Sequence, residues 1–205
     1  IGQRNASLIL GGIYEGNWNL ISTGISNTQN NRSQYTLLGI DAENRPEVVT
    51  LTDATAQPRW DEYWFAVQAG PRLVRDGQAT VTESSARAEG HANLDVTTPT
   101  RRAAIGFSRD GNQLIYVMTE RGSSVSIRRL AEIMASDEVG AWQAMNLDGG
   151  DGPAISTAEE IFARPGAGRD QSHFMVVYEA AQAPEMTRAA WDRFSQANGA
   201  SIFEE

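Results

Sequence analysis

The chain has 205 residues and a formal net charge of −9, with 17 basic against 26 acidic residues. It contains no cysteine, and every one of its basic residues is arginine. These absences exclude a thiol nucleophile, a disulfide, a cysteine metal site, a Schiff-base lysine and a lysine-containing P-loop. The acidic balance argues against nucleic acid as a partner, because a phosphate backbone is bound by clustered positive charge.

The sequence also argues against a zinc centre and a membrane-spanning segment. The two histidines, His91 and His173, are too few for a multi-histidine zinc centre. No run of about 18 apolar residues is present, so we expect no membrane-spanning segment. We expect no cofactor, and the alternative is a Ca²⁺ site at Asp148 and Asp151, whose spacing is not that of an EF-hand.

Short apolar runs bounded by glycine, asparagine, aspartate and proline predict a chain rich in β-strands. In chain order the expected strands cover residues 7–14, 34–41, 47–51, 64–69, 102–108, 114–119, 141–146 and 173–179. An Asp-Gly pair at Asp110 and Gly111 predicts a hairpin between the strands at 102–108 and 114–119.

Two helices are expected among these strands. Apolar residues recur at helical spacing from Ile127 to Met134, with Ser124 or Ser126 as the N-cap. A second helix is expected from Pro184 to about residue 198. Residues 22–33 and 148–169 have the composition of loops. The predicted fold is a single α+β domain over residues 1–205, with a mostly antiparallel or mixed sheet, two principal helices and a C-terminal helical extension at 180–205.

The densest cluster of polar and flexible residues runs from Asn146 to Gly152, directly after the expected strand 141–146. A carboxyl group at the end of a buried strand is held rigidly and partly desolvated, which shifts its pKa. The glycines allow backbone N–H groups to approach an anionic ligand closely. The alternative interpretation is a tight turn without function, because asparagine, aspartate and glycine are the residues that form turns.

A second cluster contains the adjacent residues Arg101 and Arg102. Neighbouring residues of a strand face opposite sides, so one of the two arginines is expected to point inward. A buried guanidinium requires a carboxylate, a carbonyl or an anionic ligand. A structural salt bridge remains the alternative.

These clusters together resemble the phosphodiester glycosidase family. The matching stretches are A-G-P-R-L-V-R-D-G at residues 69–77, R-A-A-I-G at 102–106, the helix around 130–134 and A-M-N-L-D-G-G at 144–150. The resemblance is best over residues 64–151 and looser on both sides. It implies a hydrolase that cleaves the bond between a sugar C1 and a phosphodiester oxygen, and members in bacteria are associated with exopolysaccharide and the cell envelope.

The resemblance also implies roles for individual residues. Arg102 suits a phosphate, because a guanidinium binds two phosphate oxygens at once. Asp148 is the candidate carboxylate, and the candidates for a second one are Asp76, Glu83 and Asp151. His91 is a candidate acid–base group, with a solvated loop histidine as the alternative. The full predicted site has Asp148, Arg102 and Asp76 as catalytic residues and binds substrate through Asn146, Gly149, Gly150, Asp151, Gly70, Arg72, Gly12 and His91.

The chain departs from the family pattern at two places. Leu10 stands where the family has an asparagine, and Asp151 and Gly152 stand where it has Gly-Ser. These changes favour the alternative of an inactive relative that binds glycan or supports an envelope assembly. In either case we expect a carbohydrate or sugar-phosphate ligand and an exported protein, and the sequence leaves the oligomeric state open.

Overall fold

The computed structural model describes residues 8–9, 36–41, 45–50, 63–147, 149–150, 152–153, 155–156 and 161–163. Its central sheet has five strands in the order β6-β5-β9-β7-β8, all paired antiparallel. The strands are β5 (Arg72–Arg75), β6 (Gln78–Ala79), β7 (Ala103–Phe107), β8 (Leu114–Met118) and β9 (Gln143–Asn146). The chain order differs from the spatial order because β9, the last of these strands, inserts between β5 and β7.

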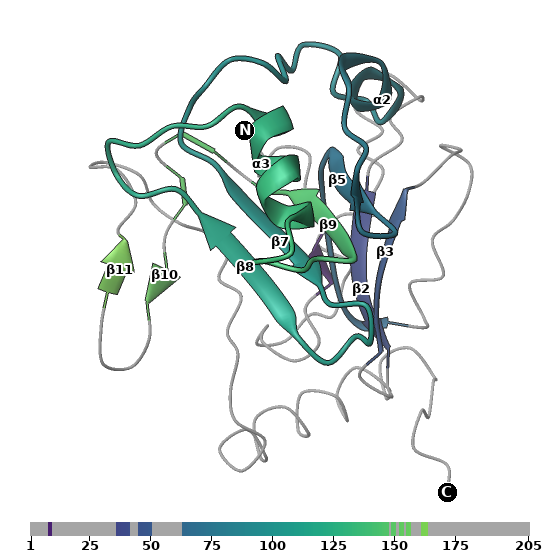
Figure 1. The fold of residues 1–205 in the computed structure, drawn as a ribbon. Helices are drawn as coiled ribbons and strands as arrows, with labels where there is room; N and C mark the ends of the chain where they lie inside the picture. The colour runs from purple at the N-terminus through teal and green to yellow at the C-terminus, as the bar shows by residue number, and fades with distance from the viewer. Residues whose placement is uncertain are drawn as a thin grey trace, which may run out of the picture.

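A second antiparallel sheet has the order β1-β4-β2-β3. Its strands are β1 (Leu8–Ile9), β2 (Thr36–Asp41), β3 (Pro46–Thr50) and β4 (Tyr63–Ala69), and a separate pair is formed by β10 (Ile155–Ser156) and β11 (Ile161–Ala163). The described helices are α2 (Glu83–Ala88) and α3 (Ile127–Ala135). This arrangement confirms the expected α+β class (Figure 1).

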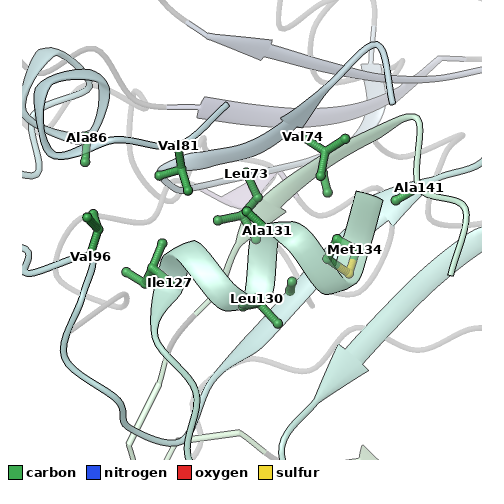
Figure 2. Close-up of a cluster of buried hydrophobic side chains, with 12 residues drawn as sticks. Leu73, Val74, Val81, Ala86, Val96, Ile127, Leu130, Ala131, Met134 and Ala141 are labelled. Carbon is green, nitrogen blue, oxygen red and sulfur yellow. The ribbon is translucent and has the colours of Figure 1, made fainter. Parts of the chain in front are cut away.

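Helix α3 covers one face of the central sheet. Its buried residues Ile127, Leu130, Ala131 and Met134 recur at the spacing of one helical face. They pack against residues of the sheet and of the segments around α2, which include Leu73, Val74, Val81, Ala86 and Val96 (Figure 2). Ala104 of β7 belongs to the same cluster. The helix begins at Ser126, whose side chain accepts a hydrogen bond from the Arg129 N–H at 3.0 Å, so the predicted helix is confirmed and Ser126 is its N-cap.

The opposite face of the central sheet packs against the second sheet. A second buried cluster joins Leu38 and Val48 from β2 and β3 to Ile105, Phe107 and Met145 from β7 and β9. Along β7 the side chains alternate, since Ala104 belongs to the cluster under α3 and Ile105 belongs to this one. The molecule is therefore layered as helix, sheet and sheet.

The predicted hairpin between β7 and β8 is present, and its loop is longer than an Asp-Gly turn. Phe107 pairs with Leu114, so residues 108–113 form the connection. Within it, Asp110 Oδ1 accepts hydrogen bonds from the Ser108 hydroxyl and the Asn112 N–H. Gly111 adopts φ +73°, which is why glycine suits this position.

Two parts of the sequence-based prediction need correction. Helix α2 was not expected, and its N-cap Thr82 and Ser85 form a reciprocal capping box that stabilises this short helix. Strands β10 and β11 lie in the segment 148–169, for which a loop was predicted. Residues 10–14, the predicted strand 173–179, the predicted helix 184–198 and the proposed extension 180–205 lie outside the described residues. Of the described helices, none has the length and hydropathy needed to cross a membrane.

Candidate functional site

Three of the predicted clusters meet at one end of the central sheet. Arg72 of β5 pairs with Met145 of β9, and Ala104 of β7 pairs with Asn146 of β9. The start of β5, the end of β9 and the start of β7 are therefore adjacent. The antiparallel register brings together residues near positions 70, 102 and 146, which are far apart in the chain.

Arg102 lies directly before β7 at this end of the sheet and is only 8% exposed. Its Nη2 donates to the Thr98 carbonyl at 3.3 Å, and its backbone N–H donates to the Thr119 hydroxyl at 2.9 Å. Nε is buried and has no acceptor among the described residues. Burial lowers the pKa of the guanidinium, and the nearby charge of Asp95 opposes this change. The guanidinium of Arg102 is therefore largely desolvated, and one of its donors, Nε, has no acceptor among the described residues.

The glycine turn after β9 lies against this arginine. A Cβ on Gly149 would be 3.5 Å from Arg102 Nη1 and 2.8 Å from the Arg101 carbonyl oxygen. The Gly150 N–H donates to the same Arg101 oxygen at 2.9 Å. The expectation that the Gly150 N–H faces a ligand is therefore wrong, because this donor fixes the turn to the start of β7.

Asn146, the last residue of β9, is 6% exposed and connects the glycine turn to the segment before β5. Its Nδ2 donates to the carbonyl oxygens of Gly70, at 3.1 Å, and Leu147, at 2.6 Å. Because both amide hydrogens are engaged, the orientation of the side chain is defined. Its Oδ1 is buried and accepts no hydrogen bond from the described residues.

Gly70 occupies a position that allows no side chain. It has φ +135° and precedes the cis bond to Pro71. A Cβ there would come within 2.9 Å of His91 Nε2 and 3.5 Å of Glu89 Oε2. Burial lowers the pKa of His91 to about 4. His91 is therefore a half-buried and neutral histidine whose Nε2 is buried at this site, which is not the solvated loop residue of the alternative interpretation.

Glu89 was not predicted as a site residue, although it is 6% exposed. Its Oε2 accepts hydrogen bonds of 2.7 Å from both the Thr36 hydroxyl and the Arg72 backbone N–H. Burial raises the pKa of the carboxyl, and these two hydrogen bonds act in the opposite direction. The sequence gives no local signal for it, because Glu89 follows a short polar helix and its burial depends on contact with β2 and β5.

Other predicted residues do not converge on Arg102. The Arg72 side chain hydrogen-bonds to the Val74 carbonyl and the Gln143 side chain. Asp76 is exposed and accepts a hydrogen bond of 3.0 Å from Gln143 Nε2. Gln143 pairs with Phe107 at the far end of β7, so Asp76 lies at the opposite end of the sheet from Arg102.

Glu83 is exposed on α2, and so it does not provide a buried second carboxylate. Asp148, Asp151 and Gly12 lie outside the described residues. The first two are also the residues of the alternative Ca²⁺ site. Within the part of the chain that the structure describes, no three histidine, aspartate or glutamate side chains gather as a metal site. Among the predicted residues, the fold brings together Arg102 and Gly149 on one side, and Asn146, Gly70 and His91 on the other.

The fold of the chain is similar to that of solved structures. The catalytic domain of zebrafish N-acetylglucosamine-1-phosphodiester alpha-N-acetylglucosaminidase, solved in a form auto-inhibited by its pro-peptide, is 15% identical with a TM-score of 0.54. The match covers 78% of this chain and 56% of that domain, so the chain spans little more than half of its length. A hypothetical protein from Synechocystis is 18% identical with a TM-score of 0.43, over 65% of this chain and 32% of that one.

No curated protein matches the chain in sequence. The phosphodiester glycosidase family matches residues 7–179, which is most of the chain and includes every element of the central sheet. The chain therefore belongs to the phosphodiester glycosidase family.

Proposed function

We propose that the protein is a hydrolase that cleaves the bond between C1 of a sugar and the oxygen of a phosphodiester, in a sugar-1-phosphodiester or a related envelope glycan. The observation that carries this proposal is the buried guanidinium of Arg102 beside Gly149, with its Nε donor open. A desolvated guanidinium binds a phosphate oxygen more strongly than an exposed one, because little water competes with the anion.

The proposed reaction breaks the C1–O bond, and the electron pair of that bond leaves with the phosphate. Arg102 stabilises the negative charge that develops on the leaving group. Asp148 assists the attack of water on C1 and accepts the proton that the water loses. The products are a free sugar and a phosphomonoester. Asp76 has no role in this scheme, because its exposed carboxyl lies at the other end of the sheet.

The test uses release of reducing sugar from a panel of sugar-1-phosphodiesters that vary in sugar and in aglycone. We expect Arg102→Ala and Asp148→Asn to lower kcat/KM by about 100-fold or more, the range found when a group that stabilises developing charge is removed. The matched control is Arg128→Ala, since Arg128 is an exposed arginine on α3. It should leave kcat/KM within about twofold. A wild-type protein that releases sugar from no member of the panel would overturn the proposal.

The second candidate is a relative that binds the same ligand without turnover, which the departures at Leu10 and at Asp151 and Gly152 favour. Calorimetric titration with a sugar-1-phosphodiester separates the two. Binding that is lost in Arg102→Ala, without sugar release by the wild type, would support this candidate. Turnover that depends on Arg102 and Asp148 would rule it out. An exported or envelope location, proposed from the family resemblance, is checked by fractionating the cells that produce the protein.

A further inference from the structure

Glu89 joins three segments that are distant in the sequence. Its Oε2 accepts one hydrogen bond from Thr36 of β2 in the second sheet and one from the backbone N–H of Arg72 in the central sheet, both at 2.7 Å. Glu89 itself follows α2 as its C-cap. One carboxylate oxygen therefore connects a helix end to both sheets, next to the turn formed by Gly70 and Pro71.

The burial of this carboxylate requires an explanation. An ionised carboxyl loses hydration when it is buried, and its partners must compensate for that loss. Here the compensation consists of the two hydrogen bonds and the positive charges of Arg72 and Arg75. His91 also lies at this position, and it carries no charge at pH 7 because burial lowers its pKa to about 4. An exposed residue would avoid the desolvation altogether, so a specific task for Glu89 is the simplest explanation.

Gly70 lies between Glu89 and Asn146, and this placement suggests the task of Glu89. On one side, the space where a Cβ would be is 3.5 Å from Glu89 Oε2. On the other side, Gly70 forms two hydrogen bonds with Asn146, from its N–H to the Asn146 carbonyl at 3.0 Å and from Asn146 Nδ2 to its own carbonyl at 3.1 Å. The conformation of the Gly70 turn, which Glu89 fixes at Arg72, therefore sets the position of the Asn146 amide.

The Asn146 amide presents an acceptor beside the glycine turn. Its Nδ2 hydrogens bond to Gly70 and Leu147, which leaves the buried Oδ1 without a donor among the described residues. A phosphate oxygen at neutral pH offers no hydrogen to this atom. A sugar hydroxyl or an amide N–H does.

We propose that Glu89 is a positioning residue: through the turn at Gly70 and Arg72 it orients Asn146 so that Oδ1 accepts a hydrogen bond from a hydroxyl or amide N–H of the sugar. The identification of that donor as part of a sugar rests on the proposed function. Arg102 then holds the acceptor-only phosphate and Asn146 the donor-bearing sugar, so the two ends of the substrate are distinguished by hydrogen-bond polarity.

The test compares Glu89→Gln, which keeps an oxygen acceptor for Thr36 and Arg72, with Glu89→Ala, which removes it. Glu138→Ala is the matched control, because Glu138 is an exposed glutamate in the loop after α3. We expect Glu89→Ala to raise KM about tenfold or more with a smaller change in kcat, and Glu89→Gln to stay within about threefold of the wild type. The control should change neither parameter.

A second readout does not depend on turnover. The side-chain amide signals of Asn146 are assigned in the ¹⁵N-labelled full chain by their absence in Asn146→Asp. We expect these signals to shift in Glu89→Ala and to keep nearly their wild-type positions in Glu89→Gln. If Glu89→Ala does not fold, Thr36→Val removes one of the two donors and should produce a smaller shift.

The outcomes separate the two proposals. Asn146 signals that do not move in Glu89→Ala, or in Thr36→Val where the former is unfolded, would overturn the positioning role, whether or not sugar is released. Equal loss of activity in Glu89→Gln and Glu89→Ala would also overturn it, because the ionisable carboxyl itself would then be required. Signals that move as expected in a protein without turnover would support the role of Glu89 and contradict only the proposed function.

Discussion

The side-chain amide of Asn146 donates a hydrogen bond of 3.1 Å to the carbonyl of Gly70, which is 76 positions earlier in the chain. A backbone hydrogen bond joins the same two residues, since the Gly70 N–H donates to the Asn146 carbonyl at 3.0 Å. This connection holds the end of β9 and its glycine turn against the start of β5.

Asn146→Asp should destabilise the protein more at pH 7 than at pH 4. The introduced carboxylate cannot donate to the Gly70 and Leu147 carbonyls, and its charge would be buried next to them. We expect a loss of about 3 kcal/mol at pH 7, in the range for a buried group left without its partner. The loss should be smaller at pH 4, where a protonated carboxyl donates one hydrogen bond.

Urea unfolding at the two pH values measures this difference. Asn93→Asp is the control, because Asn93 is exposed, and it should change the free energy of unfolding by less than about 0.5 kcal/mol. An equal loss at both pH values in Asn146→Asp would contradict the hydrogen-bond assignment.

Gly149→Ala should lower catalytic efficiency by displacing the glycine turn from Arg102. The added Cβ would be 2.8 Å from the Arg101 carbonyl oxygen, a backbone atom that cannot move aside easily. We expect kcat/KM for a sugar-1-phosphodiester to fall about tenfold or more, because catalytic groups are sensitive to displacements near 1 Å.

The control for this variant is Gly122→Ala. Gly122 also lies in a loop, and a Cβ there would meet no atom within 4 Å. It should leave kcat/KM unchanged. A Gly149→Ala protein with wild-type efficiency would show that the turn and Arg102 do not act together.

The stability of the protein should fall as the pH is lowered through the range of His91. Burial holds the pKa of His91 at about 4 in the folded state, against 6.5 for an ordinary histidine. The unfolded chain therefore binds a proton that the folded chain excludes. The contribution is fully present above pH 6.5 and is lost progressively toward pH 4, with a magnitude on the order of 3 kcal/mol.

His91→Gln removes this titration, so its free energy of unfolding should depend less on pH between 6.5 and 4. Chemical denaturation of both proteins at pH 7, 5.5 and 4 checks the prediction. Because all other titrating groups are shared, parallel curves for the two proteins would contradict the burial of a neutral His91.

Gly106→Ala should be among the most destabilising single changes in the central sheet. A Cβ at Gly106 would be 2.3 Å from the Gln143 carbonyl oxygen and 2.8 Å from the Ala144 Cβ, where β7 pairs with β9. Relief requires the two strands to separate, so we expect a loss of about 3 kcal/mol.

Gly140→Ala is the comparison for this change. A Cβ at Gly140 would have no atom within 4 Å, and its φ of +69° alone should cost about 1 kcal/mol. Thermal and urea unfolding measure both variants. A loss in Gly106→Ala no larger than that in Gly140→Ala would contradict the close approach of β7 and β9.

The sequence determined helix α3 and strands β7, β8 and β9, because their signals are short-range, whereas α2, β10 and β11 were missed. The hydrophobic spacing from Ile127 to Met134 and the cap at Ser126 specify α3 without reference to the rest of the chain. Alternation and turn residues likewise located β7, β8 and β9 to within one or two residues. The motif order also indicated the family, which the match over residues 7–179 confirms.

Only the tertiary structure decided which residues share a site, because strand register and burial are not local properties. The register around β9 placed Asn146 and Gly149 beside Gly70 and Arg102, and it left Asp76 at the opposite end of the sheet. Glu89 became a site residue only through its contacts with β2 and β5, since nothing in its neighbouring sequence distinguishes it from an exposed glutamate. The composition shows that any phosphate must be bound without lysine. Only the folded sheet shows that Arg102 is the arginine with a buried Nε that lacks an acceptor among the described residues.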